Sequence, residues 1–297
     1  MYQNLFAKIR NLEQRSNGKQ KILARYFLSH FNETSFQTVA EVANKARVSE
    51  STVIRFSREL GFKGFLHLKD EFQGVVLSKL SPSERLHVFE VQNSFEKLTD
   101  HVFEKEIHNI KETQKKLELG NLNEIAHRVV KAKKKYIIGL RASAAPAYLF
   151  GHLLNHILSN VITILIGDTS LFEGLRDIDK EDILIGFSFP RYTKRTVEAI
   201  QFARKFHTTT VAITDTEFSP ASQLSDFTLI APAYSDTFSN SYTACSTIIN
   251  MLITLITHIN KDQTEKMLAI FEDCLKEFDF FEDRITMSLK NNQGRGL

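Results

Sequence analysis

Residues 39–62, VAEVANKARVSESTVIRFSRELGF, have the apolar spacing of two short helices joined by a tight turn. Apolar side chains recur every three or four positions, so each helix has one face suited to burial. These faces consist of Val39, Val42, Ala43 and Ala46 in the first helix and of Val53, Phe56, Ser57 and Leu60 in the second. Val48 marks the turn, and Gly61 follows the second helix, where a left-handed residue commonly ends one. The segment is thus predicted to be a helix-turn-helix.

The outward face of the second helix is polar, and Ser49 stands at its N-cap position. In a DNA-binding helix-turn-helix, the second helix lies in the major groove. We therefore expect a double-stranded DNA operator as a partner, with Thr52 and Arg55 as the best candidates for contacts to bases or phosphates. The full candidate set is Ser49, Glu50, Ser51, Thr52, Arg55, Arg58, Lys63 and Lys69, of which the last three are predicted to hold the DNA backbone. The alternative is an unrelated helical hairpin with a solvated charged face.

The net charge of +3 conceals an asymmetry along the 297-residue chain. Residues 1–80 contain 13 Lys and Arg against 7 Asp and Glu, a balance of +6 that leaves −3 for the remainder. A basic N-terminal region beside a mildly acidic one is typical of a protein that binds nucleic acid at one end. Two distant cysteines, Cys245 and Cys274, fit a reduced, cytoplasmic protein. The apolar run 244–259 is too short and too polar to span a membrane, so we predict no membrane association.

A change of pattern at residue 121 predicts a second domain of a different class. Short apolar runs alternate there with helical periodicity, at 136–140, 161–166, 183–189, 209–214 and 227–231. Near-continuous apolar strands separated by helices are typical of a parallel sheet covered on both faces. Right-handed crossovers then give a doubly wound α/β domain of five strands. Further helices are predicted at 2–12, 17–31, 62–77, 95–117, 144–158, 193–206, 243–259 and 262–289, and disorder in the last eight residues.

The chain is therefore predicted to be an α/β protein of two domains. We divide it into an all-α helix-turn-helix domain at 1–78, a linker and connecting helix at 79–120, the α/β domain at 121–260, and a C-terminal helix and tail at 261–297. Residues 78–94 are polar and include Ser-Pro-Ser at 81–83, so they are predicted to form a linker.

Two strand ends of the predicted sheet carry hydroxyl groups and helix starts. In a doubly wound sheet, ligands bind beyond the carboxyl ends of the strands. Ser143 follows the first strand and stands at the start of a helix, where free N–H groups attract an anion. Ser188 and Thr193 flank another helix start after the third strand. Together these loops predict an anion site.

The segment 39–72 resembles the N-terminal domain of the RpiR/MurR family of bacterial transcription regulators. The motifs that carry the resemblance are Val48-Ser49, Thr52-Val53-Ile54-Arg55-Phe56 and Leu60-Gly61-Phe62-Lys63-Gly64-Phe65. Arg47 departs from the pattern, because many such motifs place glycine there. The resemblance implies a C-terminal sugar-isomerase-like (SIS) domain that binds phosphosugars, and the order and length of both halves match it over about residues 1–260.

The anion loops depart from the SIS pattern at defined positions. Ser143, Ser188 and Thr193 match its hydroxyl residues, but Arg141 stands at its second glycine, and Pro190 and Arg191 replace an inner Ser-Gly. Since arginine is a bidentate partner for phosphate or carboxylate, we expect a small anionic effector derived from a sugar. The candidate effector-binding residues are Arg141, Ser143, Ser188, Arg191, Thr193, Ser235 and Ser239. Ser235, Ser239 and Ser241 are alternatively helix caps, and the two arginines alternatively pair with Asp168, Asp177 or Asp215.

Catalysis and metal binding are the remaining alternatives. His152 and His156 lie one helical turn apart, but no third metal ligand has matching spacing, so a polar helix face is favoured. A SIS isomerase needs a placed acid and base, and nothing singles out Glu173 or Glu198 for that role. We therefore predict no enzyme, no cofactor and no metal, but a homodimeric or homotetrameric regulator of carbohydrate metabolism genes. The alternative function is a sugar-phosphate isomerase that carries a DNA-binding domain.

Overall fold

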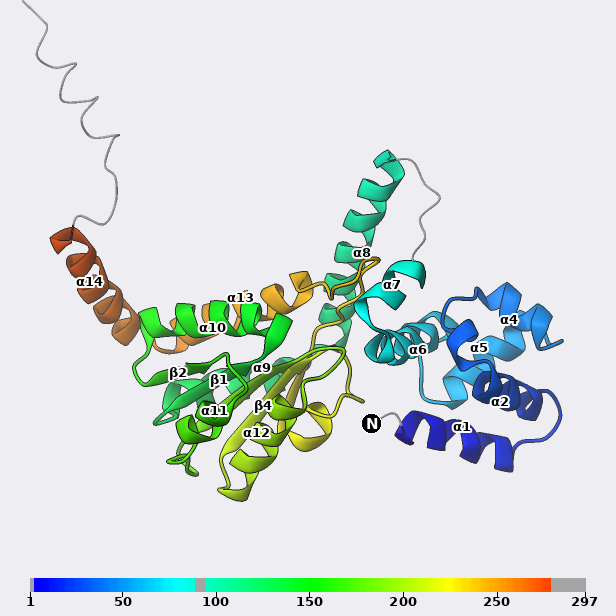
Figure 1. Ribbon diagram of the computed structural model, residues 1–297, viewed down its shortest axis with the longest axis horizontal. Coiled ribbons are helices and arrows are strands. Elements are labelled where there is room, and N and C mark those ends of the chain that lie inside the picture. Colours follow the sequence, from blue (N-terminus) through cyan, green and yellow to red (C-terminus); the bar gives the residue numbers. More distant parts are fainter. Residues whose placement is uncertain (1–2, 89–94, 279–297) are drawn as a thin grey trace, which may run out of the picture.

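The computed structural model describes residues 3–88 and 95–278, which form a helical N-terminal domain and an α/β domain connected through a long helix (Figure 1). The N-terminal helices are α1 Gln3–Arg15, α2 Lys19–Ser29, α3 Phe31–Thr34, α4 Val39–Lys45, α5 Glu50–Glu59 and α6 Phe65–Lys79. The connecting elements are α7 Pro82–Val88 and α8 Phe95–Lys116. Helix α8 lies between the domains, and its N-terminal end projects away from both (Figure 1).

The predicted helix-turn-helix consists of α4 and α5. Thr38 and Glu41 form a capping box that starts α4, and Ser49 caps α5 by accepting a hydrogen bond from the Thr52 N–H. Arg47 in the turn has a left-handed φ of 56°, and Gly61 after α5 has a φ of 95°. Most of the predicted inward faces are fully buried; only Val39 is partly exposed. The core of this domain gathers phenylalanines from several helices, with Phe27 and Phe56 stacked at 5.2 Å between ring centroids.

The α/β domain is built on five parallel strands, as predicted, and their order is β2-β1-β3-β4-β5. The strands are β1 Lys135–Gly139, β2 Val161–Ile164, β3 Ile183–Ser188, β4 Thr209–Thr214 and β5 Phe227–Ile230. The helices are α9 Leu119–Lys131, α10 Ala144–Ile157, α11 Thr169–Gly174, α12 Lys194–Lys205, α13 Thr243–Ile259 and α14 Lys261–Glu277, with short 3-10 turns at Arg141–Ser143 and Ser222–Leu224.

Helices cover both faces of this sheet. Ile137, Ile185 and Ile213 point to one face and pack with α9, α10 and α13. Residues one position away, such as Ile138 and Leu184, point to the other face and pack with α11 and α12. The strands are buried on both sides, which explains why their sequences are almost continuously apolar.

The connecting region differs from the predicted linker. Pro82–Val88 form helix α7, started by a capping box in which the Ser81 N–H donates to Glu84 and the Glu84 N–H donates to the Ser81 hydroxyl. Ser-Pro-Ser is therefore the beginning of a helix, with Pro82 at the first helical position, where its missing N–H costs nothing. Helix α9 was also not predicted. Of the helix expected at 262–289, the part after residue 278 and the tail lie outside the described residues, and the domain bounds stay predictions.

Within residues 3–88 and 95–278, no single helix combines the length and apolar character needed to cross a membrane. The pair α13 and α14 meets that criterion only when both helices are taken together, across a bend of 105°.

Candidate functional site

Most of the residues predicted to touch DNA are exposed on α5 or close to its ends. Ser49, Glu50, Ser51, Arg55, Arg58 and Lys63 are exposed, and Lys69 is half-buried. Arg55 has 66% of its side chain in solvent and lies 4.0 Å from Glu59, one turn along the helix. Arg58, Lys63 and Lys69 line one surface groove beside α5, so these three cations can act on the same stretch of phosphate backbone.

Thr52 has a different environment from the one expected of a base-contacting residue. Its exposed fraction is 7%, and its hydroxyl lies 2.8 Å from the Ser49 hydroxyl. The side chain thus belongs to the capped start of α5. A direct DNA contact by Thr52 stays a prediction, and the burial favours a structural role.

A cavity of about 200 Å³ lies beyond the carboxyl ends of β1 and β3. These two strands flank the point where the strand order reverses, which is where doubly wound sheets bind ligands. Five of the seven predicted effector residues line it: Arg141, Ser143, Arg191, Thr193 and Ser239. Ser143 and Thr193 precede α10 and α12, and neither side chain caps its helix. The free N–H groups at the start of α10 therefore bring a partial positive charge to the cavity, in addition to the guanidiniums of Arg141 and Arg191.

Arg141 and Arg191 both adopt left-handed backbone conformations, with φ angles of 57° and 67°. A side chain in this region costs about 1–2 kcal/mol relative to glycine. None of the alternative ion pairs with Asp168, Asp177 or Asp215 forms within the described chain, because these carboxylates contact Ser170, Arg176 and Tyr192 instead. Both guanidiniums are exposed at the cavity.

The other predicted effector residues lie apart from this cavity. Ser188 is 2% exposed and does not line it; its hydroxyl has no hydrogen-bond partner among the described residues. Ser235 lines a smaller neighbouring cavity and accepts a hydrogen bond from the Thr237 N–H. Ser241 donates to Glu106 and accepts from the Thr243 N–H, which favours the cap.

Sequence reasoning missed three polar residues of the cavity wall: Arg85, Asn240 and Tyr242. Arg85 comes from α7, far from the strand ends in sequence. The capping box of Ser81 and Glu84 could have predicted the helix that carries Arg85, but not the place of that helix at the cavity. A larger cavity of about 440 Å³, between α6, α8 and β5, is lined by cations and carboxylates in similar number, so it is less suited to an anion.

His152 and His156 lie on the outer side of α10 among aromatic rings. His152 stacks on Tyr148 and His156 on Phe271, with centroid distances of 5.7 and 4.6 Å. In the part of the chain that the structure describes, no group of three His, Cys, Asp or Glu side chains is placed to hold a metal ion.

Comparison with known proteins matches both halves of the chain. The family model "Helix-turn-helix domain, rpiR family" matches residues 3–79, and the "SIS domain" model matches residues 129–255. The chain belongs to the RpiR family of helix-turn-helix transcription regulators. Two relatives are the HTH-type transcriptional regulator HexR of Escherichia coli, 26% identical over 96% of this chain and 99% of that protein, and an uncharacterised HTH-type transcriptional regulator of Haemophilus influenzae, 27% identical over 76% and 79%.

Solved structures share the fold of this RpiR-family chain. The sugar isomerase domain of an RpiR transcription factor from Sphaerobacter thermophilus is 25% identical, covers 59% of this chain and 98% of that one, and superposes with a TM-score of 0.58. The NanR protein of Vibrio vulnificus, solved with ManNAc-6P, is 20% identical over 92% of this chain and 98% of that one, also with a TM-score of 0.58.

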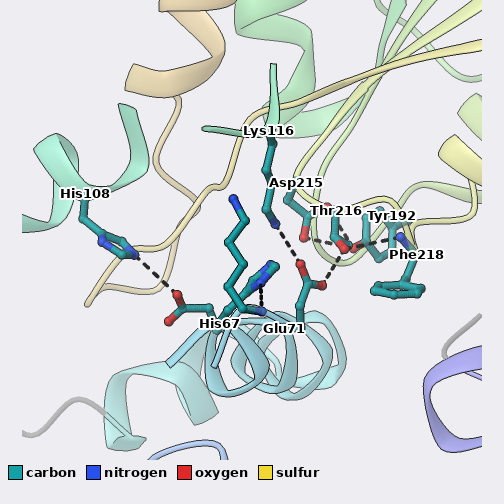
Figure 2. A network of polar contacts seen from close by, with 10 residues as sticks. His67, Glu71, His108, Lys116, Tyr192, Asp215, Thr216 and Phe218 are labelled. Atoms are coloured by element: carbon teal, nitrogen blue, oxygen red, sulfur yellow. Dashed lines mark hydrogen bonds and ion pairs between the residues drawn. The ribbon is translucent and has the colours of Figure 1, made fainter. Parts of the chain in front are cut away.

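In this RpiR-family protein the two domains meet through a buried polar network (Figure 2). Glu71 of α6 is 4% exposed and accepts hydrogen bonds from Lys116 at 2.9 Å and from the Thr216 hydroxyl at 2.6 Å. Burial would lower the pKa of Lys116, but the Glu71 carboxylate outweighs it and raises that pKa. Beside this pair, Phe218 inserts into the core of the helix-turn-helix domain. The loop after β4 thus holds α6 against the SIS domain.

Asp215 connects that network to the loop that lines the cavity at the strand ends. Its carboxylate accepts a hydrogen bond from the Tyr192 hydroxyl, with O–O distances of 2.9 and 3.1 Å. Tyr192 follows Arg191 directly and packs against the helix-turn-helix core. A movement of the backbone at Arg191 would therefore also move Tyr192, which lies at the interface between the domains.

The pH dependence of stability should report on Asp215. Burial raises its pKa to about 7, and the nearby Glu71 carboxylate adds to this, while the Tyr192 hydrogen bond opposes it. Between pH 4 and 7, roughly, the folded state keeps a proton that the unfolded chain loses, so the free energy of unfolding falls as pH rises, by at most about 1.4 kcal/mol per pH unit. We expect Asp215→Asn to flatten this part of the profile in urea unfolding at pH 5 to 7.5. Asp177→Asn, an exposed carboxylate on the same domain, is the control; equal slopes in all three proteins would contradict the assignment.

Proposed function

We propose that this regulator controls carbohydrate metabolism genes, and that its affinity for a palindromic operator changes when the SIS domain binds a small anionic, sugar-derived effector. Arg141 and Arg191 supply the main support. Both hold strained left-handed positions where the SIS pattern has glycine, and both line the cavity at the strand-order switch without an ion-pair partner in the described chain. An anionic ligand would offset that cost by accepting bidentate hydrogen bonds.

The effector belongs to the phosphosugars or the sugar acids. The start of α10 and Ser143 suit a phosphate, and the arginines suit a phosphate or a carboxylate. A thermal-shift panel of sugar phosphates, sugar acids and phosphorylated amino sugars on the full chain tests this. At least one class should raise the melting temperature of the wild type and fail to do so for Arg191→Ala. Equal shifts in both proteins would mean that the effector site lies elsewhere.

A sensor is favoured over an isomerase by the cavity wall. Among the described residues that line it, none is Glu, Asp or His, and burial raises the pKa of the Tyr242 hydroxyl, which makes it a poor base for moving a proton between carbons of a sugar. Glu198 instead pairs with Arg195 and Lys194 on the outside of α12. Incubation with aldose and ketose phosphates checks this, and robust interconversion would establish the isomerase.

Signal transfer requires the effector to prefer one arrangement of the domains over another. Arg191 and Tyr192 provide a short route, because one lines the cavity and the other contacts both Asp215 and the core of the helix-turn-helix domain. A homodimer or homotetramer would present two copies of helix α5 to the two half-sites of the operator.

Arg55→Ala is expected to weaken operator binding by about 1–3 kcal/mol and to leave effector binding unchanged, because Arg55 is exposed on α5 and far from the cavity in sequence and fold. Arg25→Ala is a matched control: Arg25 lies on α2, is also 66% exposed and also pairs with a glutamate. Fluorescence anisotropy on an operator selected from random DNA measures both. If the two variants bind equally well, α5 does not read the operator through Arg55.

A further inference from the structure

Helix α7 contributes Pro82 and Arg85 to the described wall of the effector cavity, and Arg85 brings its guanidinium there. It is only 3% exposed, and its Nη1 donates a hydrogen bond to Asn240 Oδ1 at 2.9 Å. Asn240 in turn donates to the carbonyl oxygen of Pro190 at 3.3 Å. Arg85 is thereby fixed to the loop that carries Arg191, although it comes from the segment that follows the helix-turn-helix domain.

The surroundings of Arg85 are electrostatically strained. Burial lowers the pKa of its guanidinium, and the positive charge of Arg191 lowers it further, while Asp215 acts in the opposite sense. With Arg141, three guanidiniums converge on a cavity of about 200 Å³ whose described lining contains no carboxylate. An anion that entered would replace lost hydration and relieve the repulsion between like charges.

Resting on the effector site proposed above, we propose that Arg85 binds the effector directly, as a third guanidinium, and that the effector carries two anionic groups. Arg141, Ser143 and the start of α10 hold one group, and Arg85 with Arg191 holds the other. A sugar phosphate without a carboxylate would bring an anionic group to only one of these two places.

This contact would make the effector a bridge between two parts of the chain. Only Leu80 and Ser81 separate α6 from α7, and α6 carries Glu71 of the interdomain network. A ligand that binds Arg85 therefore holds α7 against the strand ends. Because α7 follows α6 so closely, the ligand also restrains the end of α6. The same ligand could not hold α7 if Arg85 were replaced, even with the rest of the cavity intact.

Isothermal titration of the full chain with three probes tests the proposal: 6-phosphogluconate carries both anionic groups, glucose 6-phosphate only the phosphate, and gluconate only the carboxylate. The wild type should bind 6-phosphogluconate at least tenfold more tightly than either of the others. Arg85→Ala should weaken 6-phosphogluconate binding at least tenfold and glucose 6-phosphate binding less than threefold. Arg85→Lys keeps the charge without the fork and should fall between.

Two controls separate a local effect from misfolding and from failure of the site itself. Arg176→Ala removes an exposed arginine of the same domain and should change neither affinity. Arg141→Ala should weaken both phosphorylated probes, whereas Arg191→Ala should chiefly weaken 6-phosphogluconate. If Arg191→Ala weakens binding but Arg85→Ala does not, the effector site stands and the role of Arg85 is overturned. If neither variant changes binding, the proposed site fails as a whole, and if the wild type prefers glucose 6-phosphate or binds no probe, the two-anion class is overturned.

Discussion

Gly139→Ala is expected to lower the free energy of unfolding of the SIS domain by about 3 kcal/mol and to abolish effector binding. Gly139 ends β1, where a Cβ atom would lie 2.5 Å from Ala147 Cβ and inside contact distance of the Ser143 carbonyl oxygen. Neither neighbour can yield, because Ala147 is fully buried and Ser143 begins α10. The helix would have to move off the sheet and take the start of α10 out of the cavity.

Gly120→Ala is the matched control for this substitution. Gly120 lies in the first turn of α9, on the same domain, and a Cβ there meets nothing within 4 Å. Its stability should stay equal or rise by up to about 1 kcal/mol, since alanine favours a helix over glycine. Urea unfolding and titration with 6-phosphogluconate measure the two effects. A Gly139→Ala protein as stable as Gly120→Ala would show that β1 and α10 do not approach this closely.

The elements that could be predicted are those whose signals are local. The helix-turn-helix is specified by its own caps, since Thr38 with Glu41 starts α4 and Ser49 starts α5. The sheet was predictable because its strands are buried on both faces and therefore apolar throughout. Helix α7 was missed although its signal is also local: Ser81, Pro82 and Glu84 form a capping box that looks like a turn when read as Ser-Pro-Ser.

The site was predictable only where the topology itself brings residues together. Arg141 and Arg191 follow strands that pair in the sheet, so their proximity follows from the strand order. Arg85 and Asn240 meet across 155 positions of sequence, and no periodicity reports that contact. Thr52 and Ser188 carry the right chemical groups, but the turn of the helix and the pleat of the strand point them inward.

Glu71→Ala is expected to destabilise the contact between the two domains by about 3–5 kcal/mol, the usual cost of removing one partner from a buried ion pair. The substitution leaves Lys116 with a side chain only 19% exposed and without the carboxylate that it contacts at 2.9 Å, and it also removes the acceptor of the Thr216 hydroxyl. Part of the cost is offset, since the loss of the Glu71 charge also removes its electrostatic repulsion of the Asp215 carboxylate. Urea unfolding followed by separate probes on each domain, with limited proteolysis, measures the release of α6.

Two further variants separate electrostatic stability from communication between the domains. Glu124→Ala removes an exposed ion pair with Arg128, at 2.7 Å, and should cost less than about 1 kcal/mol. Glu71→Leu with Lys116→Met removes both buried charges and should regain much of the stability, because a packed apolar pair is often as stable as a buried ion pair. If that double variant folds well and binds operator DNA but no longer responds to the effector, the Glu71 network carries the signal. A normal response in Glu71→Ala would contradict this, because α6 would then receive the signal by a route that does not need its contact with Thr216.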